Sequence, residues 1–347
     1  MSEPEKKFIP IYQRLYQAYR KDIIEQKYGP GSRIDSINEM MNRHRISRET
    51  AKLVLKKLVD DELIYQKAGK GSFVADLGPR QTIWGVLVPF FSSLTEKLIA
   101  LLTLKAAQVG RKLEHYVYYN SWEEEIHLVG SLINQRYEAI IVVPTFDESK
   151  TASFYRNLIS GGSVVTLLDH TMAGSYFTYA IQSYDLGVKR AVQYLLDKTA
   201  GTLVFVKNEI WIGRNMVQEF MEETFKGFIE GMPSPRRALT FDHVRNLNPD
   251  AIRNEKIGGI FCCDDTDAVR VIGHLLDWGF KIPEEISVIS YGNTDLARYF
   301  TPKITSIDCH CEEMVDRTAA IIQDHLEGKD VRFAQYVVQP ELIIRET

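Results

Sequence analysis

The sequence predicts an α/β protein in two parts. A small winged helix-turn-helix domain occupies residues 1–75, and a two-lobed body of parallel sheets flanked by helices occupies residues 82–347, with a linker at residues 76–81. A chain of 347 residues is too long for one small core. Three helical patterns and two short strand-like runs come first, and apolar runs then alternate with helical patterns.

Composition is that of an ordinary globular protein, but charge differs between the parts. The chain is 45% hydrophobic and 25% charged. Residues 1–80 carry 16 Lys and Arg against 11 Asp and Glu, whereas residues 81–347 carry 26 against 35. We therefore expect only the head to meet a polyanion. No apolar run predicts a transmembrane helix or a secretory signal, so we expect a cytoplasmic protein without membrane contact.

The four cysteines are Cys262, Cys263, Cys309 and Cys311, and none lies in a C-x-x-C pair. In a reducing compartment they are expected as small buried residues. Metal binding through Cys309, His310 and Cys311 is the alternative, but their spacing matches no structural zinc pattern. We predict no metal and no cofactor.

The head begins with three predicted helices. The first carries Ile11, Leu15 and Ile23 on one face and ends near the Gly-Pro-Gly of residues 29–31. The sequence SINE, at residues 36–39, fits a capping box and starts a short second helix. Ser47 is the natural N-cap of the third helix.

The third helix is amphipathic and is followed by a basic hairpin. Its apolar stripe consists of Ala51, Val54, Leu55 and Leu58, and its polar side of Arg48, Glu49, Lys52 and Lys56. Two short strands then flank Ala68-Gly69-Lys70-Gly71. A lysine-rich helix face is usually just solvated, but this order of elements and the charge asymmetry predict a winged helix-turn-helix. The third helix would enter the major groove, and the wing would reach a phosphate or the minor groove.

The head resembles the GntR family of bacterial transcription regulators. The resemblance lies in IPIYQRLYQAYRKDI, YGPGSRI, ISRETAKLVLKKLVDDELI and AGKGSFVA. It implies DNA contacts by the start of the third helix and by the wing, that is by Ser47, Arg48, Glu49, Thr50, Lys52, Gly69 and Lys70. The family usually has an arginine in the second helix where this chain has Asn38, so one expected contact is missing or changed.

The body alternates apolar runs, such as IWGVLV, AIIVV, TLVFV and ISVIS, with helical patterns such as residues 94–113. This alternation predicts parallel sheets whose ligands bind beyond the carboxyl ends of the strands. Aromatic, acidic and amide side chains follow these runs, a set suited to hydroxyl-rich ligands. Each such residue could instead cap the next helix. One of Asp264 and Asp265 is expected to do so, which would leave the other to point into the site.

No catalytic motif appears in the sequence. We find no GxxxxGK[ST] loop, no GxGxxG after a strand, no G-x-S-x-G turn and no H-E-x-x-H. We therefore predict that the protein is not an enzyme.

The body resembles the LacI/GalR-type effector domain, a relative of periplasmic sugar-binding proteins. The resemblance lies in TIWGVLVP, YEAIIVVP, GIFCCDDTDAVRVIGHLLDWGFKIPEEISVISYGN, TPKITSID and PELIIRET. It implies a two-lobed, periplasmic-binding-protein-like fold. It also implies effector contacts by Phe90, Ser92, Asp169, Asp264 and Asp265.

Two positions depart from the LacI/GalR pattern. The family's aspartate after VISY is Gly292 here, and Asn293 is its expected substitute. The family's sugar-binding arginine is Thr224 here, so Trp211 or Arg214, in a longer loop, is expected to reach the cleft instead. The chain thus resembles hybrid regulators with a GntR-type head and a LacI/GalR-type body.

The resemblance implies a ligand-responsive regulator, expected to be a homodimeric repressor of carbohydrate-utilisation genes. It would be released from double-stranded DNA, an inverted-repeat operator, by a monosaccharide or derivative. We expect the dimer to form through the helix at residues 94–109. Gly78-Pro79 prevents a helical hinge in the linker. The alternative is a cytoplasmic sugar-binding or sugar-modifying protein without sequence-specific DNA binding, which a DNA shift assay would distinguish.

Overall fold

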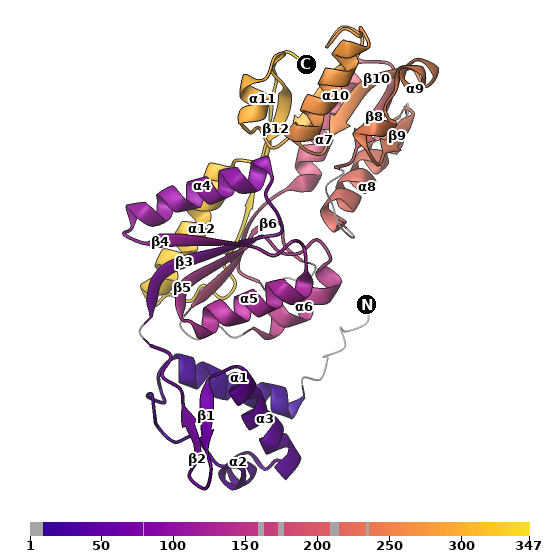
Figure 1. Ribbon diagram of the computed structural model, residues 1–347. Helices are drawn as coiled ribbons and strands as arrows, with labels where there is room; N and C mark the ends of the chain where they lie inside the picture. Colours follow the sequence, from indigo (N-terminus) through magenta and orange to yellow (C-terminus); the bar gives the residue numbers. More distant parts are fainter. Residues whose placement is uncertain (1–9, 79, 159–162, 173–176, 209–214, 234–235) are drawn as a thin grey trace.

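The computed structural model describes residues 10–347 except 79, 159–162, 173–176, 209–214 and 234–235. A small head lies below a body of two stacked lobes (Figure 1). The lobe next to the head is called the N-lobe here, and the distal one the C-lobe. No helix in the described ranges is long and apolar enough to cross a membrane.

The head has three helices followed by a hairpin, so the winged helix-turn-helix prediction is confirmed. Its elements are α1 (Ile11–Ile24), α2 (Ile37–His44), α3 (Arg48–Asp60), β1 (Ile64–Lys67) and β2 (Gly71–Val74). Ser36 and Glu39 form the predicted capping box of α2, and Ser47 caps α3. The predicted apolar stripe of α3 is buried in full.

The apolar face predicted for α1 is only partly right. Ile11 is exposed, and the helix instead buries Tyr16, Tyr19, Arg20, Ile23 and Ile24. Aromatic rings with a polar tip supply more buried area than the aliphatic residues that spacing selects.

The N-lobe is a six-stranded sheet in the order β13-β7-β6-β5-β3-β4, with every neighbouring pair parallel. Its strands are β3 (Gln81–Val88), β4 (Lys112–Val117), β5 (Tyr137–Val142), β6 (Val164–Asp169), β7 (Tyr179–Gln182) and β13 (Gln335–Val338). Helices α4 (Ser93–Gln108) and α12 (Cys311–Leu326) pack on each other on one side, and α5 (Trp122–Asn134) and α6 (Glu148–Asn157) lie on the side of the head (Figure 1).

The C-lobe repeats this design. Its sheet order is β14-β12-β11-β10-β8-β9, and only the β12–β14 pair is antiparallel. Its strands are β8 (Thr202–Val206), β9 (Ala238–Phe241), β10 (Ile257–Cys262), β11 (Ser287–Tyr291), β12 (Thr305–Asp308) and β14 (Glu341–Ile343). Its helices are α7 (Tyr184–Lys198), α8 (Met216–Glu230), α9 (Pro249–Asn254), α10 (Asp265–Asp277) and α11 (Asp295–Tyr299), with a short 3₁₀ turn at Val244–Asn246.

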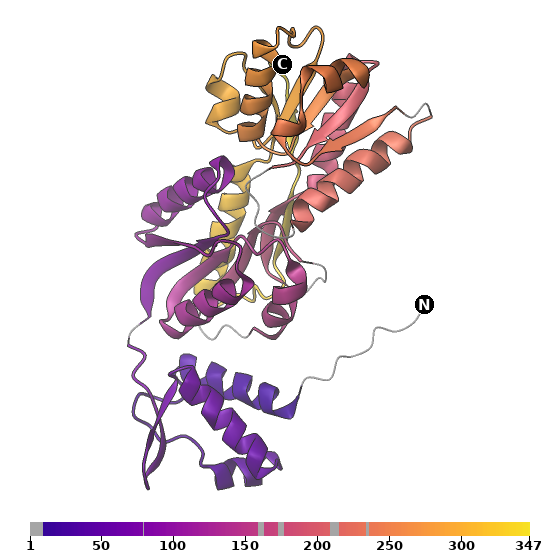
Figure 2. The same cartoon turned by 45° about the vertical axis from the view of Figure 1, so that its right-hand side comes forward.

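The chain passes between the lobes three times, from β7 to α7, from β12 to α12 and from β13 to β14. Figure 2 shows α12 leaving the C-lobe and running down beside the N-lobe sheet. Such a triple connection leaves the two lobes free to change their angle about a hinge. The carboxyl ends of both sheets face this junction, which is where the sequence places a ligand.

Candidate functional site: an exposed recognition helix and a cavity between the lobes

The start of α3 is an exposed polar surface. The Oγ of Ser47 accepts the N–H of Thr50 at 3.1 Å and lies 2.8 Å from Oγ1 of Thr50. Arg48, Glu49 and Lys52 are exposed. Lys52 donates to Oε1 of Glu49 at 2.9 Å, whereas Arg48 has no ion pair within the described chain. Arg48 is thus an exposed cation at the start of α3 that makes no ion pair within the described chain.

The wing presents two lysines. The N–H of Lys70 bonds the carbonyl of Lys67 at 2.9 Å and closes a turn in which Gly69 has φ 68°, a conformation that glycine adopts readily. The side chain of Lys70 is exposed. The Nζ of Lys67 lies 5.2 Å from the Tyr65 ring centroid and 5.4 Å from that of Phe73, in cation–π range. The sequence did not single out Lys67.

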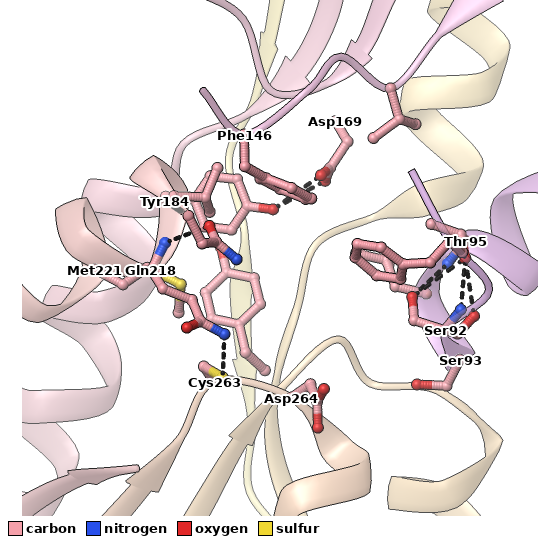
Figure 3. Close-up of a pocket in the computed structure, with 16 residues that line it drawn as sticks. Ser92, Ser93, Thr95, Phe146, Asp169, Tyr184, Gln218, Met221, Cys263 and Asp264 are labelled. Atoms are coloured by element: carbon pink, nitrogen blue, oxygen red, sulfur yellow. Dashed lines mark hydrogen bonds between the residues drawn. The ribbon is translucent and has the colours of Figure 1, made fainter. Parts of the chain in front are cut away.

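A cavity of about 80 Å³ lies between the lobes, several times the space that one water needs. Figure 3 shows its side chains, which come from strand ends and helix starts of both lobes. The N-lobe provides Phe90, Ser92, Ser93, Leu94, Thr95, Val143, Phe146 and Asp169, and the C-lobe provides Tyr184, Asn215, Val217, Gln218, Met221, Cys263, Asp264 and Tyr291.

Asp169 ends β6 and points into the cavity from the N-lobe (Figure 3). Its Oδ1 accepts the Nε2 of Gln182 at 2.5 Å, and Tyr184 donates to Oδ1 and Oδ2 at 3.1 and 3.0 Å. The Nδ1 of His170 lies 3.3 Å from Oδ2. The carboxylate is held in one orientation while lining the cavity.

Asp264 faces the cavity from the opposite lobe, below Asp169 in Figure 3. It is also the N-cap of α10, since its Oδ1 accepts the N–H of Asp267 at 2.7 Å. Its Oδ2 accepts from Asn208. Burial raises the pKa of this carboxyl, and the nearby charge of Asp265 raises it further, against the lowering effect of the cap hydrogen bond. The expectation that one aspartate caps the helix while its neighbour points into the site is therefore wrong, because Asp264 does both.

Aromatic rings line the cavity on two sides, with Phe90 and Phe146 on one side and Tyr184 and Tyr291 on the other, and His170 lies behind Phe146 outside the lining. Phe90, Phe146 and His170 stack in a row, with centroids 5.9 Å apart for the first pair and 4.8 Å for the second. Tyr184 and Tyr291 stack with ring centroids 5.4 Å apart. Flat rings of this kind suit the apolar face of a sugar ring.

Ser92 is the N-cap of α4 and forms a capping box with Thr95. Its Oγ accepts the N–H of Thr95 at 3.2 Å, so the cap role and the place in the cavity coincide. On the other side, Gln218 of α8 donates to the Sγ of Cys263 at 3.4 Å (Figure 3).

Two predicted effector residues lie elsewhere. Asp265 is fully buried inside the C-lobe, where its carboxylate accepts hydrogen bonds from Ser290, Thr294 and Ser306. Asp265 thus ties β11, β12 and the start of α11 together and does not line the cavity.

The side chain of Asn293 is also turned away from the cavity. Its Nδ2 donates to Asp308 at 2.7 Å, and its Oδ1 accepts from Arg345. Trp211 and Arg214 lie outside the described residues. Reading the residues after strands had included Tyr291, whereas the sequence had not selected the lining residues Tyr184, Asn215 and Gln218.

The charge of the cavity restricts its ligand. It has two carboxylates, and no lysine, arginine or histidine is among the described lining residues. Nor does the described chain contain a group of three or more His, Cys, Asp or Glu suited to a metal ion. Carboxylates accept hydrogen bonds from hydroxyl groups and repel phosphates. The arrangement fits a neutral, hydroxyl-rich molecule.

Comparisons with known proteins agree with both parts of this architecture. Residues 11–74 match the bacterial regulatory proteins of the gntR family, and residues 218–347 match the periplasmic binding protein-like domain. The arabinose metabolism transcriptional repressor of Halalkalibacterium halodurans is 23% identical to this chain, and the alignment covers 97% of this chain and 96% of the relative.

Two solved structures share the fold of the body. A periplasmic binding protein/LacI transcriptional regulator from Alkaliphilus metalliredigens, complexed with D-xylulofuranose, aligns with a TM-score of 0.62 and 17% identity over 77% of this chain and 99% of its own. The dimeric lac repressor aligns with a TM-score of 0.66 and 14% identity over 76% of this chain and 98% of its own. The predicted two-lobed fold is thereby confirmed.

Proposed function

Since the chain joins a GntR-type DNA-binding domain to a periplasmic binding protein-like domain, as ligand-responsive transcription regulators do, we propose that it is a repressor released from its operator by a neutral sugar. The observation that carries this proposal is the pair Asp169 and Asp264, which face one cavity from opposite lobes. Hydroxyl groups of a sugar bonded to both carboxylates would favour the closed arrangement of the lobes. A ligand that prefers one state shifts the equilibrium only by its difference in affinity for the two states.

A pentose is the first candidate effector. The relative that aligns over nearly the whole chain is a repressor of arabinose metabolism, and a structure with the same body fold holds D-xylulofuranose. The small cavity and its lack of described cationic side chains support an unphosphorylated monosaccharide over a sugar phosphate.

Thermal unfolding with a panel of monosaccharides and their phosphates tests this ligand class. A sugar at 100 times its dissociation constant adds about 2.7 kcal/mol to the free energy of unfolding. We expect arabinose or another neutral pentose to raise the melting temperature and its phosphate not to do so. A stabilising effect of phosphates alone would contradict the proposed ligand class.

The proposed regulator acts as a homodimer on an inverted repeat, because one winged helix makes few base contacts. The supporting surface lies on the edge of the body that carries α4, β4 and α11 (Figures 1 and 2). Large apolar side chains are exposed along it, namely Phe91, Leu104, Val109, Tyr119, Leu296 and Tyr299. Exposed apolar clusters of this kind mark protein interfaces.

A further inference from the structure

The first turn of α5 is bonded to the loop that forms one wall of the cavity. Glu125, which is fully buried, accepts the N–H of Thr145 at 2.9 Å and the hydroxyl of Tyr155 at 2.6 Å. Asn120, two residues before the helix, accepts Oγ1 of Thr145 at 3.0 Å and the N–H of Phe146 at 3.1 Å. The position of this loop is therefore fixed to the start of α5.

The other end of α5 is bonded to the head. Asn134, the last residue of the helix, donates from Nδ2 to the carbonyl of Asp61 at 3.0 Å, directly after α3. Its Oδ1 accepts Nη2 of Arg20, a buried residue of α1, at 3.3 Å. Arg136 donates to the carbonyl of Gly78 in the linker at 2.6 Å. One helix end thus holds α1, α3 and the linker.

We propose that α5 transmits the state of the effector cavity to the DNA-binding head, with Glu125 and Asn134 as its two points of contact. The inference rests on the proposed function, because it requires a ligand in the cavity. Asn134 lies nine positions after Glu125, a rise of roughly 14 Å along the helix, and we expect so short a helix to move as one body. Figure 1 shows α5 between the N-lobe sheet and the head.

The route starts at Phe146, whose ring lines the cavity and stacks between Phe90 and His170. A sugar ring placed against Phe146 shifts this residue. The N–H groups of residues 145 and 146 then move α5 through their hydrogen bonds to Glu125 and Asn120. The bonds of Asn134 pass this shift to α1 and to the end of α3. The described linker residues 76–78 and 80 form no helix or strand that could transmit it instead.

The test compares Asn134→Ala with Gln135→Ala. Gln135 is the exposed next residue, and its side chain bonds Ser131 of its own helix at 2.9 Å, so it is a matched control. Fluorescence anisotropy measures affinity for DNA from upstream of the protein's own gene, with and without arabinose. We expect wild type and Gln135→Ala to lose at least tenfold in DNA affinity with arabinose, and Asn134→Ala to lose less than threefold.

The Asn134→Ala variant should bind DNA alone and arabinose alone with affinities within threefold of wild type. Such values would show that the variant is folded and that only the coupling has changed. Equal release from DNA in Asn134→Ala and wild type would overturn the α5 route and leave the proposed function intact. A wild-type protein whose DNA binding ignores arabinose and every other neutral pentose would overturn the inference together with the proposal beneath it.

A second readout needs no sugar, because coupling between two sites is reciprocal. Binding of DNA alone should alter hydrogen exchange at the N–H groups of Thr145 and Phe146 in wild type and in Gln135→Ala. The same amides should be unaffected in Asn134→Ala. Exchange that changes equally in all three proteins would also overturn the route through α5.

Discussion

Gln182 donates from Nε2 to Oδ1 of Asp169 at 2.5 Å, and its Oε1 accepts the hydroxyl of Tyr291 from the C-lobe at 2.8 Å. The carboxylate that lines the cavity is thus bonded to the C-lobe twice, directly by Tyr184 and through the Gln182 amide by Tyr291. Orientation of Asp169 is fixed before a ligand arrives, which lowers the entropy that ligand binding would cost. The same amide makes Asp169 sensitive to the angle between the lobes.

Asp169→Asn should bind operator as wild type does but respond poorly to the sugar. Asp169 has φ 72°, a conformation that asparagine tolerates, so this change preserves the backbone. Loss of a charge-assisted hydrogen bond to a hydroxyl weakens sugar binding by about 2 kcal/mol. Calorimetry measures the sugar affinity, and Asp185→Asn, on the half-exposed start of α7, is the control. A wild-type dose response in Asp169→Asn would remove this residue from the site.

Asp264 allows the cap and ligand roles to be separated. Asp264→Asn keeps a good N-cap for α10, so its stability should stay near wild type while its sugar affinity falls. Asp264→Ala should lose sugar affinity and also about 1 kcal/mol of stability. Chemical denaturation and calorimetry measure the two effects. Full sugar affinity in Asp264→Asn would mean that the residue only caps the helix.

Arg48 and Lys70 should differ in how they affect DNA binding. Arg48→Ala is expected to weaken specific binding by about 1–3 kcal/mol if its side chain reaches a base edge, and to affect random DNA less. Lys70→Ala should weaken both DNAs evenly and flatten the salt dependence, as loss of a phosphate contact does. Anisotropy at several salt concentrations measures both. Equal losses on specific and random DNA with Arg48→Ala would show that Arg48 does not read sequence.

Leu104→Lys should convert the dimer to a monomer. Leu104 is 64% exposed on α4, so the lysine is accommodated in an isolated chain but is desolvated in the interface that we propose. Sedimentation at micromolar concentration measures the mass, and Phe220→Lys, on the distant helix α8 with 45% of Phe220 exposed, is the control. A wild-type monomer, or a Leu104→Lys dimer, would place the interface elsewhere.

Glu125 should make stability depend on pH. Burial raises the pKa of Glu125 from 4.5 to about 7, against the lowering effects of the Tyr155 hydroxyl and the Thr145 amide. Because the folded pKa exceeds the unfolded one, the group destabilises the fold as pH rises from about 4.5 to 7. The full penalty, reached above pH 7, is about 3 kcal/mol.

Glu125→Gln removes this titration. The free energy of unfolding of the variant minus that of wild type should be largest above pH 7 and smallest near pH 4.5. Urea denaturation across this range measures the difference. A difference that does not change with pH would show that the carboxyl does not titrate there.

Local features of the head could be predicted because each depends on neighbouring residues. The capping box at Ser36 and the cap at Ser47 need only four consecutive residues, and the stripe of α3 needs only helical spacing. The short strands β7, β9, β12, β13 and β14 were missed, since three or four residues give too little pattern unless, as at β1 and β2, a glycine turn between them marks a hairpin. Which lobe each of these strands joins is decided by hydrogen bonding to strands distant in the sequence, as when β13 pairs with β7.

The cavity could be predicted only in part. Reading the residues after strands found Phe90, Asp169 and Asp264, because carboxyl ends of parallel strands meet at one edge. It could not find Tyr184 or Gln218, which enter from the starts of α7 and α8. Nor could it decide between Asp264 and Asp265. Adjacent side chains at a helix start point in different directions, and the sequence does not say how the helix is oriented relative to the cavity.

The most direct test of the account is a titration of arabinose, followed by the other neutral pentoses, against the wild-type protein on DNA from upstream of its own gene. Anisotropy of labelled DNA reports release. The account predicts saturable release from the specific DNA by a neutral pentose, with at least a tenfold loss of affinity, and no release by the same sugar from Asp169→Asn. Specific DNA binding that none of the pentoses alters, or release that is equal in Asp169→Asn, would contradict it.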